Sequence, residues 1–74
     1  MGEDRAVDVF RFIEDSVPFE GHTFVWVRCP DIEDFDVVEA TREEAIAVAT
    51  SFVEFLRRFS GNTDPFRSEL YDAV

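Results

Sequence analysis

The fold is decided largely by one segment, residues 41–61, whose sequence is TREEAIAVATSFVEFLRRFSG. Thr41 is a candidate N-cap, and Glu44 three residues later completes a capping box. Acidic residues near the start and arginines near the end complement the helix dipole, and Gly61 suits a C-terminal cap. The apolar residues that recur at helical spacing are Ala45, Val48, Ala49, Phe52, Leu56 and Phe59. The segment therefore predicts an amphipathic helix over residues 42–59.

The residues before this helix predict three strands, because β-branched and aromatic residues are concentrated in three short segments. Proline and glycine in the segment Glu14–Gly21 predict a long hairpin loop after the first strand. Pro30 cannot donate to a strand ladder, so the second strand is expected to end before it. The predicted strands are Val7–Ile13, His22–Cys29 and Phe35–Glu39.

The end of the chain predicts a short helix. Asp64-Pro65 is a possible helix start, and the helix would run to about Tyr71 with Phe66 and Leu70 as its apolar anchors. The expected fold is α+β: a three-stranded antiparallel sheet (β-β-β-α), one long amphipathic helix packed on one face, and a short C-terminal helical turn. Residues 1–74 are expected to form one domain, with residues 1–5 and 72–74 frayed.

The charge of the chain is strongly negative. Its 74 residues include 17 acidic side chains, seven arginines and no lysine, which gives a formal net charge of -10. Hydrophobic residues make up 46% of the chain and nine are Phe, so a disordered acidic tail is excluded. The negative field favours a basic protein or nucleoprotein complex as partner, and it disfavours direct binding to nucleic acid or to a membrane. A salt-adapted proteome or a GC-rich genome is an alternative explanation for the total charge.

Two features are candidates for partner binding. The stretch Asp31–Glu39 holds five carboxylates, and either meets a basic partner, imitates nucleic-acid phosphates, or is merely a solvated turn. Trp26 lies between Phe24 and Arg28 on one face of its predicted strand, where it is either an interface anchor or packed under the helix. The candidate partner-binding residues are therefore Asp31, Glu33, Asp34, Asp36, Glu39 and Trp26.

No catalytic, cofactor or metal site is expected. His22 and Cys29 are each the only residue of their type, and they fall at opposite ends and on opposite faces of the second predicted strand, so they cannot form a nucleophile–base pair. An EF-hand loop starting at Asp31 is excluded, because its sixth and twelfth positions hold Asp36 and Arg42. A single cysteine allows no internal disulfide. With no apolar run of membrane-spanning length and an acidic N-terminus, a cytoplasmic, non-enzymatic protein is expected.

The stretch 23–59 resembles the HicB-like antitoxin domain. The resemblance rests on the turn Pro30-Asp31-Ile32 after the second predicted strand, and on a helix start formed by Thr41, Glu43, Glu44 and Ala45. The family usually has a glycine before the capping threonine, where this chain has Ala40. The resemblance implies a truncated ribonuclease-H fold that binds a small basic RNA-cleaving toxin and covers its active surface.

The function that these observations favour is that of a small non-enzymatic acidic inhibitor, which occludes the basic nucleic-acid-binding surface of a partner as a HicB-like antitoxin does. One alternative is a phage-encoded nucleic-acid mimic that inhibits a CRISPR or restriction complex. A second alternative is a halophilic or GC-biased homodimeric accessory domain with no inhibitory role. All three are compatible with a small, single, acidic domain.

Overall fold

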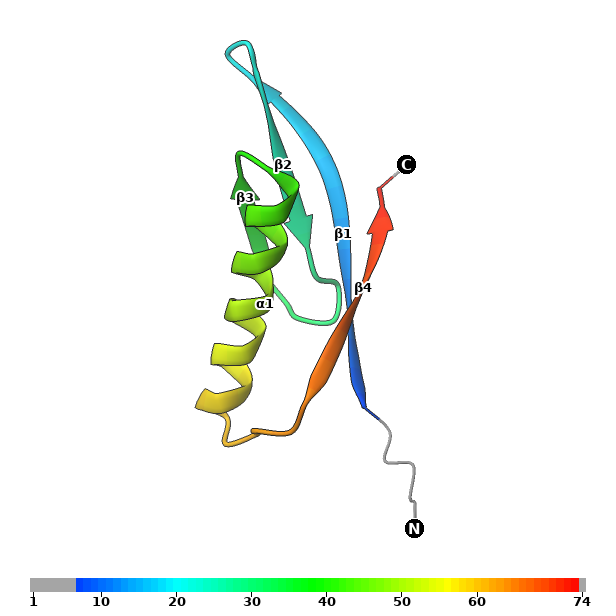
Figure 1. Ribbon diagram of the computed structural model, residues 1–74, viewed down its shortest axis with the longest axis vertical. Coiled ribbons are helices and arrows are strands. Elements are labelled where there is room, and N and C mark those ends of the chain that lie inside the picture. Colours follow the sequence, from blue (N-terminus) through cyan, green and yellow to red (C-terminus); the bar gives the residue numbers. More distant parts are fainter. Residues whose placement is uncertain (1–6, 74) are drawn as a thin grey trace.

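A computed structural model describes residues 7–73 of the chain, and in this part the order of elements is β-β-β-α-β. The four strands form one sheet in the order β3-β2-β1-β4. Neighbours β1 and β2, and β2 and β3, are antiparallel, whereas β4 is parallel to β1. The helix lies across one face of the sheet, so the molecule has two layers (Figure 1). The elements are β1 (Asp8–Phe19), β2 (His22–Arg28), β3 (Asp36–Glu39), α1 (Arg42–Phe59) and β4 (Phe66–Asp72).

The prediction of a three-stranded antiparallel sheet with a C-terminal helical turn is wrong, although the α+β class is right. Residues Phe66–Asp72 form β4, which pairs with β1 from Asp8↔Phe66 to Glu14↔Asp72. An isolated helix of this length is marginal in water. As a strand, the same segment satisfies the backbone N–H and C=O groups along one side of β1. Pro65 also biases the residue before it towards extended backbone, which suits entry into a strand.

The prediction of a long hairpin loop over Glu14–Gly21 is also wrong. Strand β1 continues to Phe19, and the connection to β2 is the two-residue turn Glu20-Gly21, with φ values of 50° and 81°. Positive φ at both central residues is the geometry of a type I′ hairpin turn, which matches the twist of the two strands. Pro18 is tolerated because β4 ends opposite Glu14, so this part of β1 has a neighbour on one side only.

The helix prediction is confirmed. Helix α1 spans Arg42–Phe59, and the hydroxyl of Thr41 accepts the N–H of Glu44 at 3.2 Å while donating to the Glu44 carboxylate at 3.1 Å. Ala45 and Ala49 are fully buried, and their small side chains let the helix approach the sheet closely. The core between the two layers consists of Phe12, Val27, Cys29, Phe35, Val37, Ala45, Ala49 and Val53.

Two ion pairs join the ends of α1 to β1. At the start of the helix, Nε of Arg42 donates to both carboxylate oxygens of Glu14 at 2.8 and 2.9 Å, and this contact raises the pKa of the Arg42 guanidinium. At the end of the helix, Arg57 donates to Asp8 at 2.8 Å. The helix is thus held along the length of the sheet by charge-assisted contacts as well as by apolar packing.

The predicted frayed ends lie partly outside the described residues, which exclude 1–6 and 74. At the C-terminal side, Asp72 still belongs to β4, and the N–H of Ala73 donates to the carbonyl of Glu14 at 2.9 Å. These two residues therefore continue the sheet. The helix in the described part of the chain does not combine the length and apolar character that a membrane span requires.

Candidate functional site

The face of the sheet that points away from α1 is the main candidate binding surface. Side chains alternate along each strand, so Trp26 lies on the opposite face from Val27, which is fully buried against α1. Packing of Trp26 under the helix, one of the two interpretations of the sequence, is therefore wrong. In the described residues nothing covers this face, which we call the open face; its exposed apolar side chains include Val9, Val38 and Tyr71, with exposed fractions of 37%, 54% and 46%.

Trp26 is held in place by two polar neighbours on the open face. Its indole Nε1 donates to Oδ1 of Asp36 on β3 at 2.9 Å. The guanidinium carbon of Arg28 lies 4.7 Å from the centre of the indole ring, which is within range of a cation–π contact. Nε of Arg28 is buried and has no hydrogen-bond partner in the described chain. The contacts with Asp36 and Arg28 therefore restrict the orientation of the half-buried indole.

The acidic stretch does not act as one patch, because Asp31 has a structural role. Its carboxylate accepts the backbone N–H of Arg11 at 2.8 Å and the guanidinium of the same residue at 3.1 Å. Strand β2 ends at Arg28, so Asp31 supplies the acceptor that β1 would otherwise lack at this position. The hydrogen bonds from Arg11 also lower the pKa of the Asp31 carboxyl below its usual range. The carboxylate of Asp31 is therefore paired with Arg11 within the fold.

The other four carboxylates of the stretch lie in different surroundings. Asp36 accepts from Trp26 on the open face, whereas Glu39 alternates with Val38 and points to the helix side. Glu33 and Asp34 lie in the turn before β3, where Asp34 adopts a φ of 61°. A shallow hollow of about 310 Å³ brings part of the predicted set together, since its lining includes Arg28, Glu33, Asp34 and Asp36. Within residues 7–73, the carboxylates of Glu33, Asp34 and Glu39 form no hydrogen bond or ion pair.

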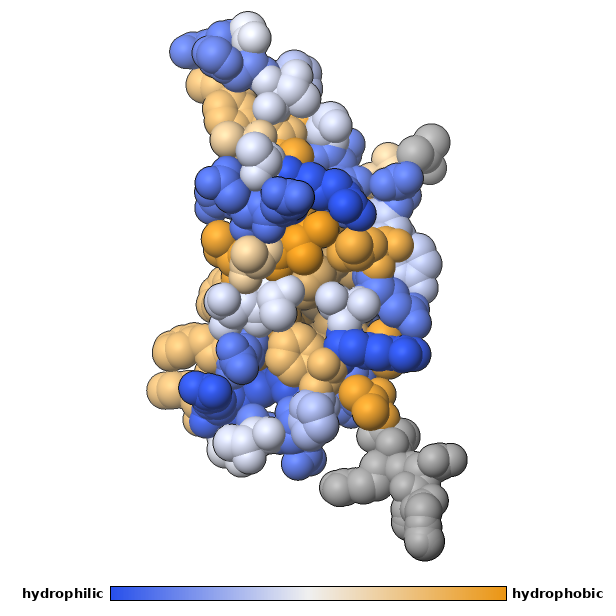
Figure 2. Space-filling model, viewed as in Figure 1, coloured by the Kyte–Doolittle hydropathy of each residue, from blue (hydrophilic) through white to orange (hydrophobic). Residues whose placement is uncertain are grey.

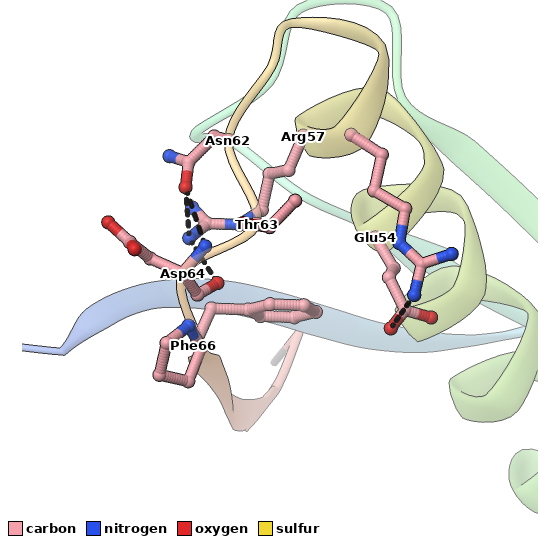
Figure 3. Close-up of a pocket in the computed structure, with 8 residues that line it drawn as sticks. Glu54, Arg57, Asn62, Thr63, Asp64 and Phe66 are labelled. Carbon is pink, nitrogen blue, oxygen red and sulfur yellow. Dashed lines mark hydrogen bonds and ion pairs between the residues drawn. The ribbon is translucent and has the colours of Figure 1, made fainter.

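A second hollow, of about 360 Å³, lies between the end of α1 and the segment that leads into β4 (Figure 3). Arg57 occupies its wall and donates to the carbonyl of Asp64 at 2.9 Å, in addition to its pair with Asp8. The same guanidinium lies 5.5 Å from the ring centre of Phe10 and 5.1 Å from that of Phe66. Its donors are used to join helix, loop and sheet, so this hollow is a structural junction. Sequence reasoning assigned Arg57 only to the helix dipole.

The two side chains considered for catalysis, Cys29 and His22, lie in different surroundings. Cys29 belongs to the core, and burial raises the pKa of its thiol, so the reactive thiolate is disfavoured. His22 lies exposed at the start of β2, at the hairpin end of the sheet. Across residues 7–73 no three His, Cys, Asp or Glu side chains gather in a way that could hold a metal ion.

One surface, formed by exposed apolar residues of α1, was not predicted from the sequence. Among the apolar residues at helical spacing, Val48, Phe52 and Phe59 are exposed by 43%, 39% and 83%, and Phe55, which was not assigned, is exposed by 60%. They lie beside the buried residues Ala45, Ala49 and Val53, and the ring of Phe52 stacks on the core residue Phe35 with ring centres 5.1 Å apart, so the apolar face of α1 is broader than the part that the sheet buries. The signal was available in the sequence, because the apolar residues of this helix are too many for one narrow face.

Comparisons with known proteins identify no relative: no family model, no curated protein and no solved structure matches this chain.

Proposed function

We propose that this chain is a small non-enzymatic acidic inhibitor, which binds the basic nucleic-acid-binding surface of a partner protein and occludes it. The observation that carries the proposal is a sheet face that no described residue covers, and that holds Trp26 together with the exposed apolar side chains of Val9, Val38 and Tyr71, in a chain with a net charge of -10. An uncovered apolar surface of this kind marks an interaction site. The excess of negative charge selects a basic partner for it.

The distribution of arginine supports this reading of the charge. Five of the described arginines are paired with carboxylates, and the pairs of three of them, Arg11, Arg42 and Arg57, join segments that are distant in the sequence. These three arginines therefore pair with acidic groups that hold the fold together, and within residues 7–73 the carboxylates of Glu33, Asp34 and Glu39, in and before β3, have no such partner. Of these, Glu33 and Asp34 lie in the turn that leads to Asp36 on the open face and can steer a basic surface towards Trp26, whereas Glu39 points to the helix side.

Trp26 is suited to be the central anchor of such an interface. Tryptophan is among the residues that most often dominate binding energy, especially where it is surrounded by groups that exclude water. The contacts with Asp36 and Arg28 already restrict the indole, so less side-chain entropy is lost on binding. The opposite charges of the two proteins then set the rate at which they meet and their relative orientation. The indole, once it is buried in the interface, supplies much of the affinity.

The resemblance to HicB-like antitoxins suggests the class of partner, a small basic RNA-cleaving toxin. In the structure, the residues that carry the resemblance also have local roles: Thr41 and Glu44 cap α1, and Asp31 pairs with Arg11. The same surface would serve a nucleic-acid mimic that blocks a larger nucleoprotein complex. The two versions differ in whether the captured partner is a small nuclease or a guide-carrying or restriction complex.

The test is capture of the partner followed by competition. The immobilised chain is incubated with a lysate of the organism that encodes it, and captured proteins are identified by mass spectrometry. We expect a basic protein that binds RNA or DNA alone and loses this activity when the chain is added. Recovery of nothing except the chain itself, or of a partner that still binds nucleic acid in the complex, would contradict the proposal.

Two matched variants then locate the charged part of the interface. Glu33→Lys with Asp34→Lys reverses two charges of the loop before β3, and Glu20→Lys with Asp64→Lys reverses two charges elsewhere. Each pair changes the net charge equally and includes one residue at positive φ, Asp34 or Glu20. We expect the first pair to slow association with the captured partner at least about tenfold more than the second. Equal effects would mean that only the total charge matters.

A further inference from the structure

The outer edge of β4 is a surface that the proposed function does not use. In the sheet order β3-β2-β1-β4, strand β4 lies at an edge, and no described residue pairs with its outer side. The N–H of Ala73 donates to the carbonyl of Glu14 at 2.9 Å, so the odd-numbered residues of β4 turn their backbone groups towards β1. By alternation, the even-numbered residues turn theirs outwards. The outer edge therefore presents the N–H and C=O groups of Phe66, Ser68, Leu70 and Asp72.

We propose that this edge pairs with the same edge of a second copy, as two antiparallel β4 strands related by a two-fold axis that passes beside Ser68 and is perpendicular to the sheet. In this register Ser68 lies opposite Ser68 of the second copy, and Phe66 lies opposite Leu70 of the second copy. All of these residues turn their backbone groups outwards, so each opposed pair exchanges two hydrogen bonds. The two four-stranded sheets become one continuous sheet.

The charges of β4 argue for a second copy and for this register. Arg67 and Glu69 flank Ser68, and both side chains point to the open face. An axis beside Ser68 places Arg67 of each copy opposite Glu69 of the other, so opposite charges meet on both sides of the axis. An axis beside Arg67 or beside Glu69 would place two like charges opposite one another, which is unfavourable. An axis beside Leu70 would leave Arg67 without a carboxylate opposite it. Strand β4 therefore complements itself in the Ser68 register.

The side chains of Arg67 and Glu69 are available for this exchange. They are 67% and 43% exposed, and within one chain they approach each other only to 3.7 Å. An exposed pair of this kind contributes little to stability. Directly opposed residues of antiparallel strands have Cβ atoms about 5 Å apart, which allows a shorter contact. Glu69 can keep its hydrogen bond from Tyr71 at 2.7 Å, because that bond uses the other carboxylate oxygen.

The helix side of β4 gains cover in the same dimer. Leu70 pairs with Phe12 on the helix side of the sheet, yet it is 41% exposed, because α1 packs mainly over β2 and β3. Figure 2 shows hydrophobic side chains at the surface beside α1, over β1 and β4. The dimer places Phe66 of the second copy against Leu70, and such cross-strand apolar pairs are stabilising. Because α1 lies towards the β3 edge (Figure 1), the two helices stay apart.

The opposite edge of the sheet is not suited to the same pairing. Strand β3 has four residues, of which Asp36 and Glu39 are acidic and none is basic. Two copies of β3 would bring carboxylates to the seam with no opposite charge to meet them. Each copy also has a net charge of -10, so the copies repel one another and the β4 dimer is expected to be weak.

The dimer does not rest on the proposed inhibitory function. A two-fold axis perpendicular to the sheet leaves both open faces on the same side, and in each copy β1 separates the strand of Trp26 from β4. The chain alone tests the dimer, whereas the captured partner tests the inhibitor, so either proposal can fail without the other. If both hold, the dimer presents two Trp26 anchors on one side.

The test is sedimentation equilibrium of the full chain over a wide range of concentration at about 0.15 M salt, where the Debye length is about 8 Å. We expect a reversible dimer, whose Kd Ser68→Pro raises at least about tenfold, because proline removes the N–H donors at the axis. The monomer tolerates this variant, since the N–H of Ser68 points away from β1.

Ser16→Pro is the matched control for this variant. The N–H of Ser16 also points to the β4 side of β1, but Ser16 lies beyond the end of β4, and its N–H bonds only to the side chain of Asp15. We expect this variant to change the Kd less than about twofold, as for a surface substitution outside the interface.

Charge exchange tests the register. Glu69→Arg should raise the Kd at least about threefold, although it reduces the repulsion between the copies, because it places two arginines opposite one another. Adding Arg67→Glu should restore the dimer, because the pair is re-formed with opposite polarity and the net charge returns to -10. Circular dichroism of each variant establishes that the chain remains folded.

Hydrogen exchange of the backbone amides gives an independent readout. The N–H groups of Ser68 and Leu70 should become protected only at concentrations where the dimer forms, whereas that of Glu69 is protected by β1 in the monomer as well. A chain that stays monomeric at every concentration would overturn the proposal. So would a dimer that Ser68→Pro leaves intact, or one that the double charge exchange fails to restore. A monomer that loses a captured foreign protein on Ser68→Pro would also overturn it, because the edge would then take a foreign strand.

Discussion

The two faces of the sheet differ far more in how much of their surface other parts of the chain cover than in their residue composition. On the face towards α1, Phe12 and Val27 are fully buried and Val37 is 6% exposed, whereas on the open face Val9, Val38 and Tyr71 are 37–54% exposed. Both faces carry apolar side chains at alternate positions of the same strands. One helix can cover only one face of a sheet. The apolar side chains of the strands would therefore allow either face of the sheet to be buried. The path of the chain, which places α1 on one side, decides which face becomes the core.

The largest expected effect comes from opening the covered face. Phe12→Ala should lower the free energy of unfolding by about 4 kcal/mol, because it removes a fully buried ring that stacks on Phe35 and leaves a cavity. A domain of this size has a total stability of roughly 4–11 kcal/mol, so much of the folded state would be lost. Urea unfolding followed by circular dichroism gives the value.

Phe19→Ala is the counterpart of this variant on β1, since Phe19 is 61% exposed. It should change the free energy of unfolding by less than about 0.5 kcal/mol. Similar losses for the two variants would show that the hairpin end of the sheet is packed against something in solution.

A smaller effect is expected from two neighbouring valines that point to opposite faces of β3. Val37→Ala should lower the free energy of unfolding by about 2 kcal/mol, because two methyl groups leave a buried position. Val38→Ala should cost less than about 0.5 kcal/mol, because Val38 is 54% exposed. The difference between their thermal midpoints is the measurement. Reversal of the order would mean that the open face is the true core.

The smallest effect concerns the exposed ion pair between Arg11 and Asp31. Arg11 lowers the pKa of Asp31 in the folded state, so the pair contributes stability above the ordinary carboxyl pKa of about 4, and that contribution is lost as pH falls through the lowered folded value. Arg11→Met should return the pKa of Asp31 towards its usual range, as measured by NMR titration of the carboxyl. An unchanged pKa would show that the two side chains do not pair in solution.

Local patterns in the sequence predicted the parts of the structure that depend on neighbours in the chain. The capping box of Thr41 and Glu44 and the helical spacing after it identified α1 at its observed bounds. The end of β2 before Pro30 follows from a missing N–H donor. The extension of β1 to Phe19 was missed because Pro18 and Gly21 were both assigned to a loop, although Gly21 serves a tight type I′ turn. Strand β4 was missed because its pairing with β1 joins residues far apart in sequence.

The candidate site was predicted in part for the same reason. Trp26 and Asp36 were both identified as partner-binding candidates, but their hydrogen bond depends on the pairing of β2 with β3. Asp31 was counted with the free carboxylates, and only the fold shows that it is used by Arg11. The exposure of Val48, Phe55 and Phe59 on α1 was not predicted, because spacing alone cannot tell which apolar residues of a broad helical face meet the sheet.

The sequence by itself determined the acidity of the chain, the helix over residues 42–59 and the existence of more apolar surface than one core can hold. These are properties of composition and of interactions between residues a few positions apart. Only the tertiary structure decided that residues 66–72 form a strand, that Trp26 lies on the open face, and that Asp31 is paired with Arg11. Each of these depends on a partner distant in the chain, whose position is set by strand pairing and by the side of the sheet on which α1 packs.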